Sequence, residues 1–186
     1  MVLAKIFEIV HWVGAVGSAI LLIISILDIG GFRAFMADGF AESGTTLSTY
    51  CLDVNVVGIG GEINAIALIL FWAGSIITFG LMAMVFRNIY LIMKTLNGKN
   101  KHSNGTSPFQ KDVIRMIKEI GIFSISAPVV AFFLSAVICA VSMINGMDGV
   151  EVSVGIEGFI VGLISLCLTN VFTYGAELEK DVDGLL

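Results

Sequence analysis

The sequence predicts an all-α membrane protein built as a four-helix bundle, and three observations lead to this fold class. First, 57% of the 186 residues are apolar and 13% are charged, a balance more apolar than that of soluble domains. Second, four long stretches contain no charged residue. Third, nearly all basic residues lie on one side of these stretches. The formal charge of -5 further argues against direct nucleic-acid binding, which requires a clustered basic surface.

The four uncharged stretches are long enough to cross a bilayer. They hold 19, 24, 28 and 19 residues. Each stretch lies between two charged residues, in order Glu8 and Asp28; Glu62 and Arg87; Glu119 and Asp148; and Glu157 and Glu177. A hydrocarbon core about 30 Å thick needs roughly 20 helical residues, and backbone groups in lipid must bond internally. We therefore expect one membrane domain over residues 1–186, with spans at about 6–27, 63–93, 113–145 and 157–175. A cleaved signal peptide is the alternative interpretation of the first span.

The basic residues predict the orientation, because loops rich in Lys and Arg stay on the cytoplasmic side. Nine of the ten lie before the first uncharged stretch, between the second and the third, or after the fourth, and only Arg33 lies on the other side. We therefore expect the chain to lie in the cytoplasmic membrane with both termini in the cytoplasm. The cytoplasmic side would also hold an inner loop at 94–112 and a tail at 176–186. The outer loops are 28–62 and 146–156.

Both outer loops contain an alternating pattern that is typical of strands. Apolar residues recur at every second position from Tyr50 to Val56 and from Val150 to Ile156, with polar residues between them. We expect these two segments to pair as a small sheet outside the membrane, and two irregular loops are the alternative.

The inner loop contains a predicted helix start. Ser107 supplies a capping hydroxyl, Pro108 suits the first helical position, and Gln110 follows three residues after the cap. Helix three should thus begin before the membrane and lie along the headgroups with a basic, amphipathic first part.

Small residues at a spacing of four predict close helix packing. Gly158 and Gly162 form such a pair in span four, and Ala127, Ala131 and Ser135 form a similar stripe in span three. We interpret them as internal contacts of one bundle. A seam between two copies in a homo-oligomer is the alternative.

Four polar residues in or beside the spans are candidates for a function within the membrane. Glu8 and His11 share one helical face, while Asn64 and Asn170 lie near span ends and are expected to face inward. Interfacial anchoring is favoured over proton transfer for Glu8 and His11, and a metal site would need further ligands. No cofactor site, metal site or catalytic residue can be named, so we expect a protein that is not an enzyme.

The order of features resembles one bacterial membrane family. A long outer loop follows span one, the inner loop reads Thr106, Ser107, Pro108, Phe109 before a basic helix start, and the tail reads Tyr174, Gly175, Ala176, Glu177, Leu178 before an acidic run to Asp183. This whole-chain pattern resembles the family catalogued as domain of unknown function 2975 (DUF2975), although Leu185 stands where the family often has Thr.

The resemblance implies a partner and carries over no catalytic residue. Some members are encoded beside a small helix-turn-helix regulator, which would dock on the inner loop and tail. The candidate docking residues here are Phe109, Arg115, Glu177, Asp181 and Asp183. We thus expect a sensor, regulatory or scaffold protein that couples its outer loops to a cytoplasmic partner. A small transporter, channel or immunity protein is the alternative, in which Glu8, His11, Asn64 and Asn170 would line a hydrated path.

Overall fold

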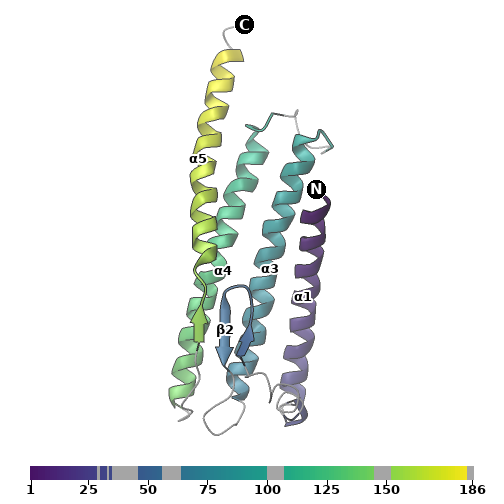
Figure 1. The fold of residues 1–186 in the computed structure, drawn as a ribbon, viewed down its shortest axis with the longest axis vertical. Helices are drawn as coiled ribbons and strands as arrows, with labels where there is room; N and C mark the ends of the chain where they lie inside the picture. The colour runs from purple at the N-terminus through teal and green to yellow at the C-terminus, as the bar shows by residue number, and fades with distance from the viewer. Residues whose placement is uncertain are drawn as a thin grey trace. The chain divides into compact units, whose positions relative to one another are not determined.

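The computed structural model describes residues 1–28, 30–32, 34, 46–55, 64–99, 107–144 and 152–183. Over these ranges the chain forms the long helices α1 (Val2–Leu27), α3 (Ala65–Leu96), α4 (Lys111–Ile144) and α5 (Glu157–Asp183) (Figure 1). The strands β1 (Thr46–Ser48), β2 (Leu52–Asn55) and β3 (Val152–Val154) form one small sheet. The predicted all-α four-helix class is confirmed.

Each of these four helices is long and apolar enough to cross a membrane. Their apolar side chains are largely exposed, as lipid contact requires; in α5, for example, Ile160, Leu163 and Ile164 face outward. The chain is therefore a multi-pass membrane protein.

The helices extend beyond the expected spans. Helix α1 begins at Val2, four residues before the expected start of span one, and α3 continues to Leu96, three residues past the expected end of span two. The segment expected as a separate tail at 176–186 instead continues α5 as far as Asp183. The physical reason is composition, because Ala, Glu, Leu and Lys are strong helix formers and no Gly or Pro interrupts them before that residue.

Helix α4 starts later than the predicted capping motif places it. The Ser107 hydroxyl accepts a hydrogen bond from the Phe109 amide at 3.2 Å, and the Gln110 side chain donates to the Ser107 carbonyl at 2.8 Å. These bonds close a separate turn at 108–109, and the helix begins at Lys111 with the Ile114 amide bonded to the Gln110 carbonyl. The cap prediction was therefore wrong by one turn, since Ser107 bonds two residues ahead and not three.

The chain divides into two compact units. The first contains residues 1–11, 81–126 and 157–186, and the second contains 12–80 and 127–156. In the first unit, Phe7 of α1 stacks on Phe86 of α3 with ring centroids 5.1 Å apart. Met82, Val85 and Ile120 form a buried apolar cluster between α3 and α4. Helix α1 thus contacts α3, and α3 contacts α4, by apolar packing.

Helices α4 and α5 of the first unit approach closely at two glycines. A Cβ atom added to Gly162 would lie 2.9 Å from the Gly121 carbonyl oxygen and would collide with the Ile125 side chain. A Cβ added to Gly121 would lie 2.8 Å from Leu166. Gly158 is also buried. Gly162 thus contacts α4 of its own bundle, in agreement with internal packing, and its partner Gly121 was not anticipated from the sequence.

The second unit holds the sheet and the other small-residue stripe. Ala127 and Ala131 are fully buried in α4, whereas Ser135 is half-buried and donates to the Phe132 carbonyl. Gly74 of α3 lies close to two neighbouring side chains. A Cβ atom added there would lie 2.5 Å from Leu134 of α4 and 3.5 Å from Leu52 of β2. The sheet therefore packs its apolar face against α3.

The predicted pairing of the two alternating segments is confirmed where the structure describes them. Strands β2 and β3 are antiparallel, with Leu52 opposite Val154 and Val54 opposite Val152. Leu52 and Val54 are fully buried, as their alternation predicts. Val56 and Val150 lie outside the described residues. Three features differ from expectation. Strand β1 adds a third strand, and Tyr50 and Ile156 lie outside the strands and are exposed. Cys51, which occupies a polar position in the alternation between Tyr50 and Leu52, is buried in the bend that precedes β2.

Candidate functional site

The strongest candidate surface lies in the first unit, where the turn before α4 contacts the end of α5. The Phe109 ring lies against Gly175 so closely that a Cβ there would collide with it, and its centroid is 5.7 Å from that of Phe172. The Ser107 hydroxyl donates to Glu179 at 2.8 Å. One apolar contact and one charge-assisted hydrogen bond therefore hold the turn on α5.

A pocket of about 340 Å³ opens at this contact, and we call it the turn-helix pocket. It is lined by Phe109, Gly175, Leu178, Glu179 and Val182. The residues from α5 recur at intervals of three and four, so they share one helical face. Leu178 is 48% exposed and Val182 is 57% exposed, beyond the uncharged part of the helix. The pocket thus combines exposed apolar side chains with a carboxylate at its edge.

The last turns of α5, which carry this pocket, are acidic. Glu177, Glu179 and Asp181 are all exposed on the last turns of α5, with Lys180 as the basic residue among them. Asp183 ends the helix, and its side chain lies outside the described part of the chain. An apolar centre with a charged rim is the usual anatomy of a protein interface.

The five candidate docking residues do not form one surface. Phe109 lines the turn-helix pocket, whereas Arg115 and Glu177 line a second groove on a different face of α5. The turn-helix pocket uses residues 175, 178 and 182 of α5, and the second groove uses residues 173, 177 and 180. At 100° per residue, the two sets lie about 200° apart around the helix and so on different faces. The sequence placed all five near one end of the bundle but could not assign them to faces.

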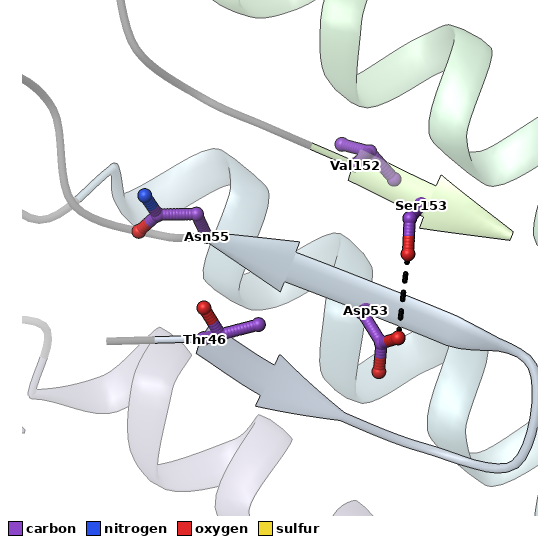
Figure 2. A pocket seen from close by; sticks show the side chains of 5 residues that line it. All are labelled: Thr46, Asp53, Asn55, Val152 and Ser153. Atoms are coloured by element: carbon purple, nitrogen blue, oxygen red, sulfur yellow. Dashed lines mark hydrogen bonds between the residues drawn. The ribbon is translucent and has the colours of Figure 1, made fainter. Parts of the chain in front are cut away.

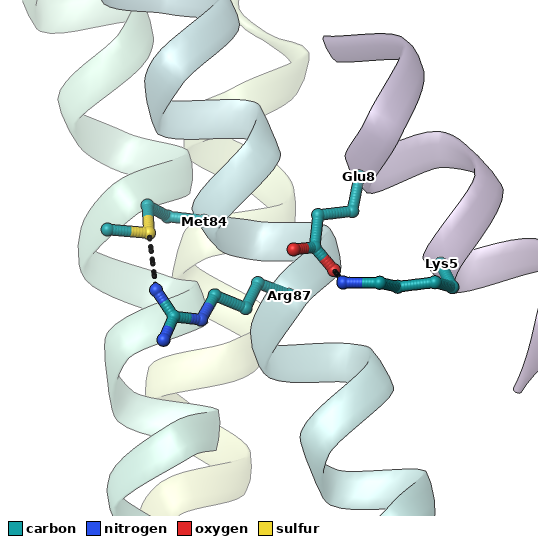
Figure 3. Close-up of polar contacts among 4 residues, drawn as sticks. All are labelled: Lys5, Glu8, Met84 and Arg87. Carbon is teal, nitrogen blue, oxygen red and sulfur yellow. Dashed lines mark hydrogen bonds and ion pairs between the residues drawn. The ribbon is translucent and has the colours of Figure 1, made fainter. Parts of the chain in front are cut away.

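Glu8 and His11 both lie in the first unit and have local partners. Lys5 of α1 donates to Glu8 at 2.9 Å (Figure 3), and the Glu8 side chain is 9% exposed. The Lys5 ammonium also lies 5.2 Å from the centre of the Tyr90 ring. His11 Nδ1 is 2.7 Å from the Phe7 carbonyl oxygen, and its ring lies 4.9 Å from that of Phe86. Glu8 is thus ion-paired within two helical turns of the start of α1, which fits an anchoring role.

The two asparagines are placed differently from each other. Asn64, in the second unit, is 2% exposed, and its Oδ1 accepts hydrogen bonds from the amides of Ile66 and Ala67 while its Nδ2 donates to Ser142. Asn170, on α5 in the first unit, is exposed, so its expected inward orientation was wrong. The buried or half-buried side of α5 passes through Gly162, Ser165 and Thr169, and Asn170 lies about 100° further around the helix from Thr169. Asn64 thus lies in a different unit from the other three polar candidates.

A buried polar contact in the first unit was missed by the sequence argument. Asn88 of α3 is 6% exposed and donates to Glu119 of α4 at 3.0 Å, and Arg115 lies 3.7 Å from the same carboxylate. An amide within a long apolar helix is the signal that could have indicated such a contact. Its partner, 31 residues away, depends on how the two helices pack.

The sheet of the second unit carries a polar pocket of about 390 Å³. Figure 2 shows its lining residues Thr46, Asp53, Asn55, Val152 and Ser153, which come from all three strands. Ser153 donates to Asp53 at 3.3 Å. The strand alternation places the polar side chains of Thr46, Asp53, Asn55 and Ser153 on the face opposite the buried Leu52 and Val54.

Metal-binding chemistry has no support in the part of the chain that the structure describes, where no three His, Cys, Asp or Glu side chains gather. The architecture and these surfaces define a multi-pass α-helical membrane protein with a small sheet and a structured turn beside the end of α5. The chain matches no protein-family model, and no curated protein or solved structure is significantly similar to it.

Proposed function

We propose that this protein is a non-enzymatic regulatory or scaffold protein of the cytoplasmic membrane, in which the turn-helix pocket docks a cytoplasmic protein. Nine of the ten basic residues support placing this end of the bundle, and both termini, in the cytoplasm. The proposal rests mainly on one observation: Leu178 and Val182 are exposed beside an apolar pocket. Both residues lie on the part of α5 that follows its uncharged run.

The chemistry of the surface favours a basic partner with an apolar anchor. Exposed apolar groups beside a pocket supply most of the binding energy in protein interfaces, and rim charges direct association. Glu179 supplies a carboxylate at the pocket, and Glu177 and Asp181 add negative charge elsewhere on the same turns of α5. A small helix-turn-helix regulator fits this description, because DNA-binding domains are basic. The resemblance to DUF2975 supports the same kind of partner.

The polar pocket of the sheet is the corresponding candidate on the outer side. It would bind a small polar ligand through Asp53, Asn55 and Thr46, and the protein would then relate an external signal to its cytoplasmic partner. The exposed position of Asn170 gives no support to the transport alternative, in which this residue would line a hydrated path.

Site-specific photocrosslinking in the native host tests the docking surface. A photoreactive amino acid at Leu178 should crosslink one small basic protein, identified by mass spectrometry. The same probe at Met93, which is 38% exposed on α3 of the same unit, serves as the control and should not. Val182→Ser should reduce the product at position 178, whereas Leu96→Ser should leave it unchanged.

Two outcomes would count against the proposal. One is an identical set of products from positions 178 and 93. The other is crosslinking from position 178 only to lipid or to a second copy of the chain, which would favour a function within the membrane.

A further inference from the structure

A second groove of the first unit, between α4 and α5, has a basic rim and an apolar floor. Its volume is about 440 Å³. Lys111, Arg115 and Lys118 of α4 and Lys180 of α5 line it, together with Ile114 and Ala176. The residues from α4 recur at intervals of three and four, so they form one stripe along that helix. We call this feature the basic groove.

The lysines are the cations that remain available in the basic groove. Arg115 already lies 3.8 Å from Asp112 and 3.7 Å from Glu119, so its charge is shared with two carboxylates. Lys111, Lys118 and Lys180 form no ion pair with any residue that the structure describes. All three are exposed.

The charge of the basic groove opposes that of the whole chain. Four basic side chains line it against one carboxylate, that of Glu177, in a protein whose formal charge is -5. Such a concentration of cations attracts anionic ligands. Acidic protein segments and anionic lipid headgroups are both candidate ligands, because both carry negative charge. The composition of the groove floor decides between these two candidates.

The floor and the position along the helix favour a lipid. Ile114 and Ala176 are half-buried apolar residues beneath the charged rim. Lys118 lies two residues before Ile120, where the 28-residue uncharged run of α4 begins. The groove therefore lies where a spanning helix leaves the hydrocarbon, at the depth of lipid headgroups.

We propose that the basic groove binds an anionic phospholipid, with Lys111, Lys118 and Lys180 holding the headgroup phosphate and the apolar floor accommodating the start of the acyl chains. The lysines suit this role because an ammonium group on a flexible stem binds phosphate as a point charge. Basic pockets between helices on the cytoplasmic side are suited to such headgroups. The site is separate from the turn-helix pocket, so it does not depend on the proposed partner.

Native mass spectrometry of the full-length protein in mild detergent tests the proposal. The probes are phosphatidylglycerol, which is anionic, and phosphatidylcholine, which has no net charge. The test variant is Lys111→Gln, Lys118→Gln, Lys180→Gln combined. The matched control is Arg87→Gln, Lys94→Gln, Lys99→Gln, which removes the same charge from α3 and the residues after it.

We expect the wild type to retain one phosphatidylglycerol in preference to phosphatidylcholine. Each lysine near an anionic headgroup contributes about a factor of five in binding, so the triple variant should bind phosphatidylglycerol about 100-fold more weakly. The control triple should stay close to wild type. Equal loss in both triples, or equal retention of the two lipids by the wild type, would overturn the proposal.

Photolabelling of the wild type removes any dependence on how the variants fold. A phosphatidylglycerol that carries a photoreactive group near its headgroup should label peptides that contain residues 111–118 and 173–180. Labelling spread over all exposed helix faces, or confined to other segments, would show that the groove holds no bound lipid and would leave an acidic protein segment as its occupant.

Discussion

Replacing Asn64 with alanine should destabilise the bundle, because this side chain makes two different structural contacts. Its Oδ1 accepts hydrogen bonds from the amides of Ile66 and Ala67, both at 3.1 Å, and so caps the start of α3. Its Nδ2 donates to the Ser142 hydroxyl of α4, also at 3.1 Å. Both side chains are buried, at 2% and 4% exposure. Water therefore cannot replace either contact in the variant.

The two contacts set the size of the effect. Loss of an asparagine cap costs about 1 kcal/mol, and a hydrogen bond between membrane helices contributes about 0.6 kcal/mol. Asn64→Ala should thus lower the free energy of unfolding by roughly 1.5 to 2 kcal/mol, and Ser142→Ala by about 0.6 kcal/mol. Asn64→Ser should keep the cap but lose the contact with α4, so its cost should match that of Ser142→Ala.

Unfolding by sodium dodecyl sulfate, followed by circular dichroism in mixed micelles, measures these differences. A double-mutant cycle between positions 64 and 142 should return a coupling of about 0.6 kcal/mol. If Asn64→Ala were as stable as wild type, or Ser142→Ala cost as much as Asn64→Ala, the structural role argued here would be refuted. In that case Asn64 would return as a candidate for a hydrated path.

Two further predictions concern packing and orientation. Gly162→Ala should destabilise the protein by roughly 1–3 kcal/mol in the same unfolding assay, because its Cβ would collide with α4, whereas Gly80→Ala has open space and should stabilise by about 0.5–1 kcal/mol. Equal effects of the same sign would contradict the close approach of α4 and α5. In a background without native cysteines, Ser153→Cys should react with an impermeant maleimide in intact cells, and Lys180→Cys only after permeabilisation; the reverse pattern would invert the proposed orientation.

The local patterns in the sequence were sufficient for the helices and for one strand pair. Four charge-free runs predict four helices because a bilayer leaves the backbone few alternatives. The alternation around Leu52 and Val152 predicts strands because side chains point to opposite faces of a sheet. The β1 strand, Thr46–Ser48, was not predicted, since a three-residue strand is too short to show a period.

The boundaries and partners were predicted less well. The capping pattern at Ser107 predicted a helix start, but its hydrogen bonds close a separate turn and the helix begins at Lys111, since several local bonds satisfy the same residues. Glu179 and Ser107 are 72 residues apart, so no local pattern could pair them. The same holds for Asn88 with Glu119 and for Gly121 with Gly162, whose meeting depends on how the helices pack.

By itself, the sequence determined that this chain enters a membrane as four helices, because apolar length and charge placement act on each segment independently of the others. Only the tertiary structure decided which faces meet. It placed Phe109 on Gly175, separated Arg115 and Glu177 from that contact, and turned Asn170 outward. The reason is physical: a rotation of one residue moves a side chain by about 100° around a helix, so packing between helices selects the face that composition leaves open.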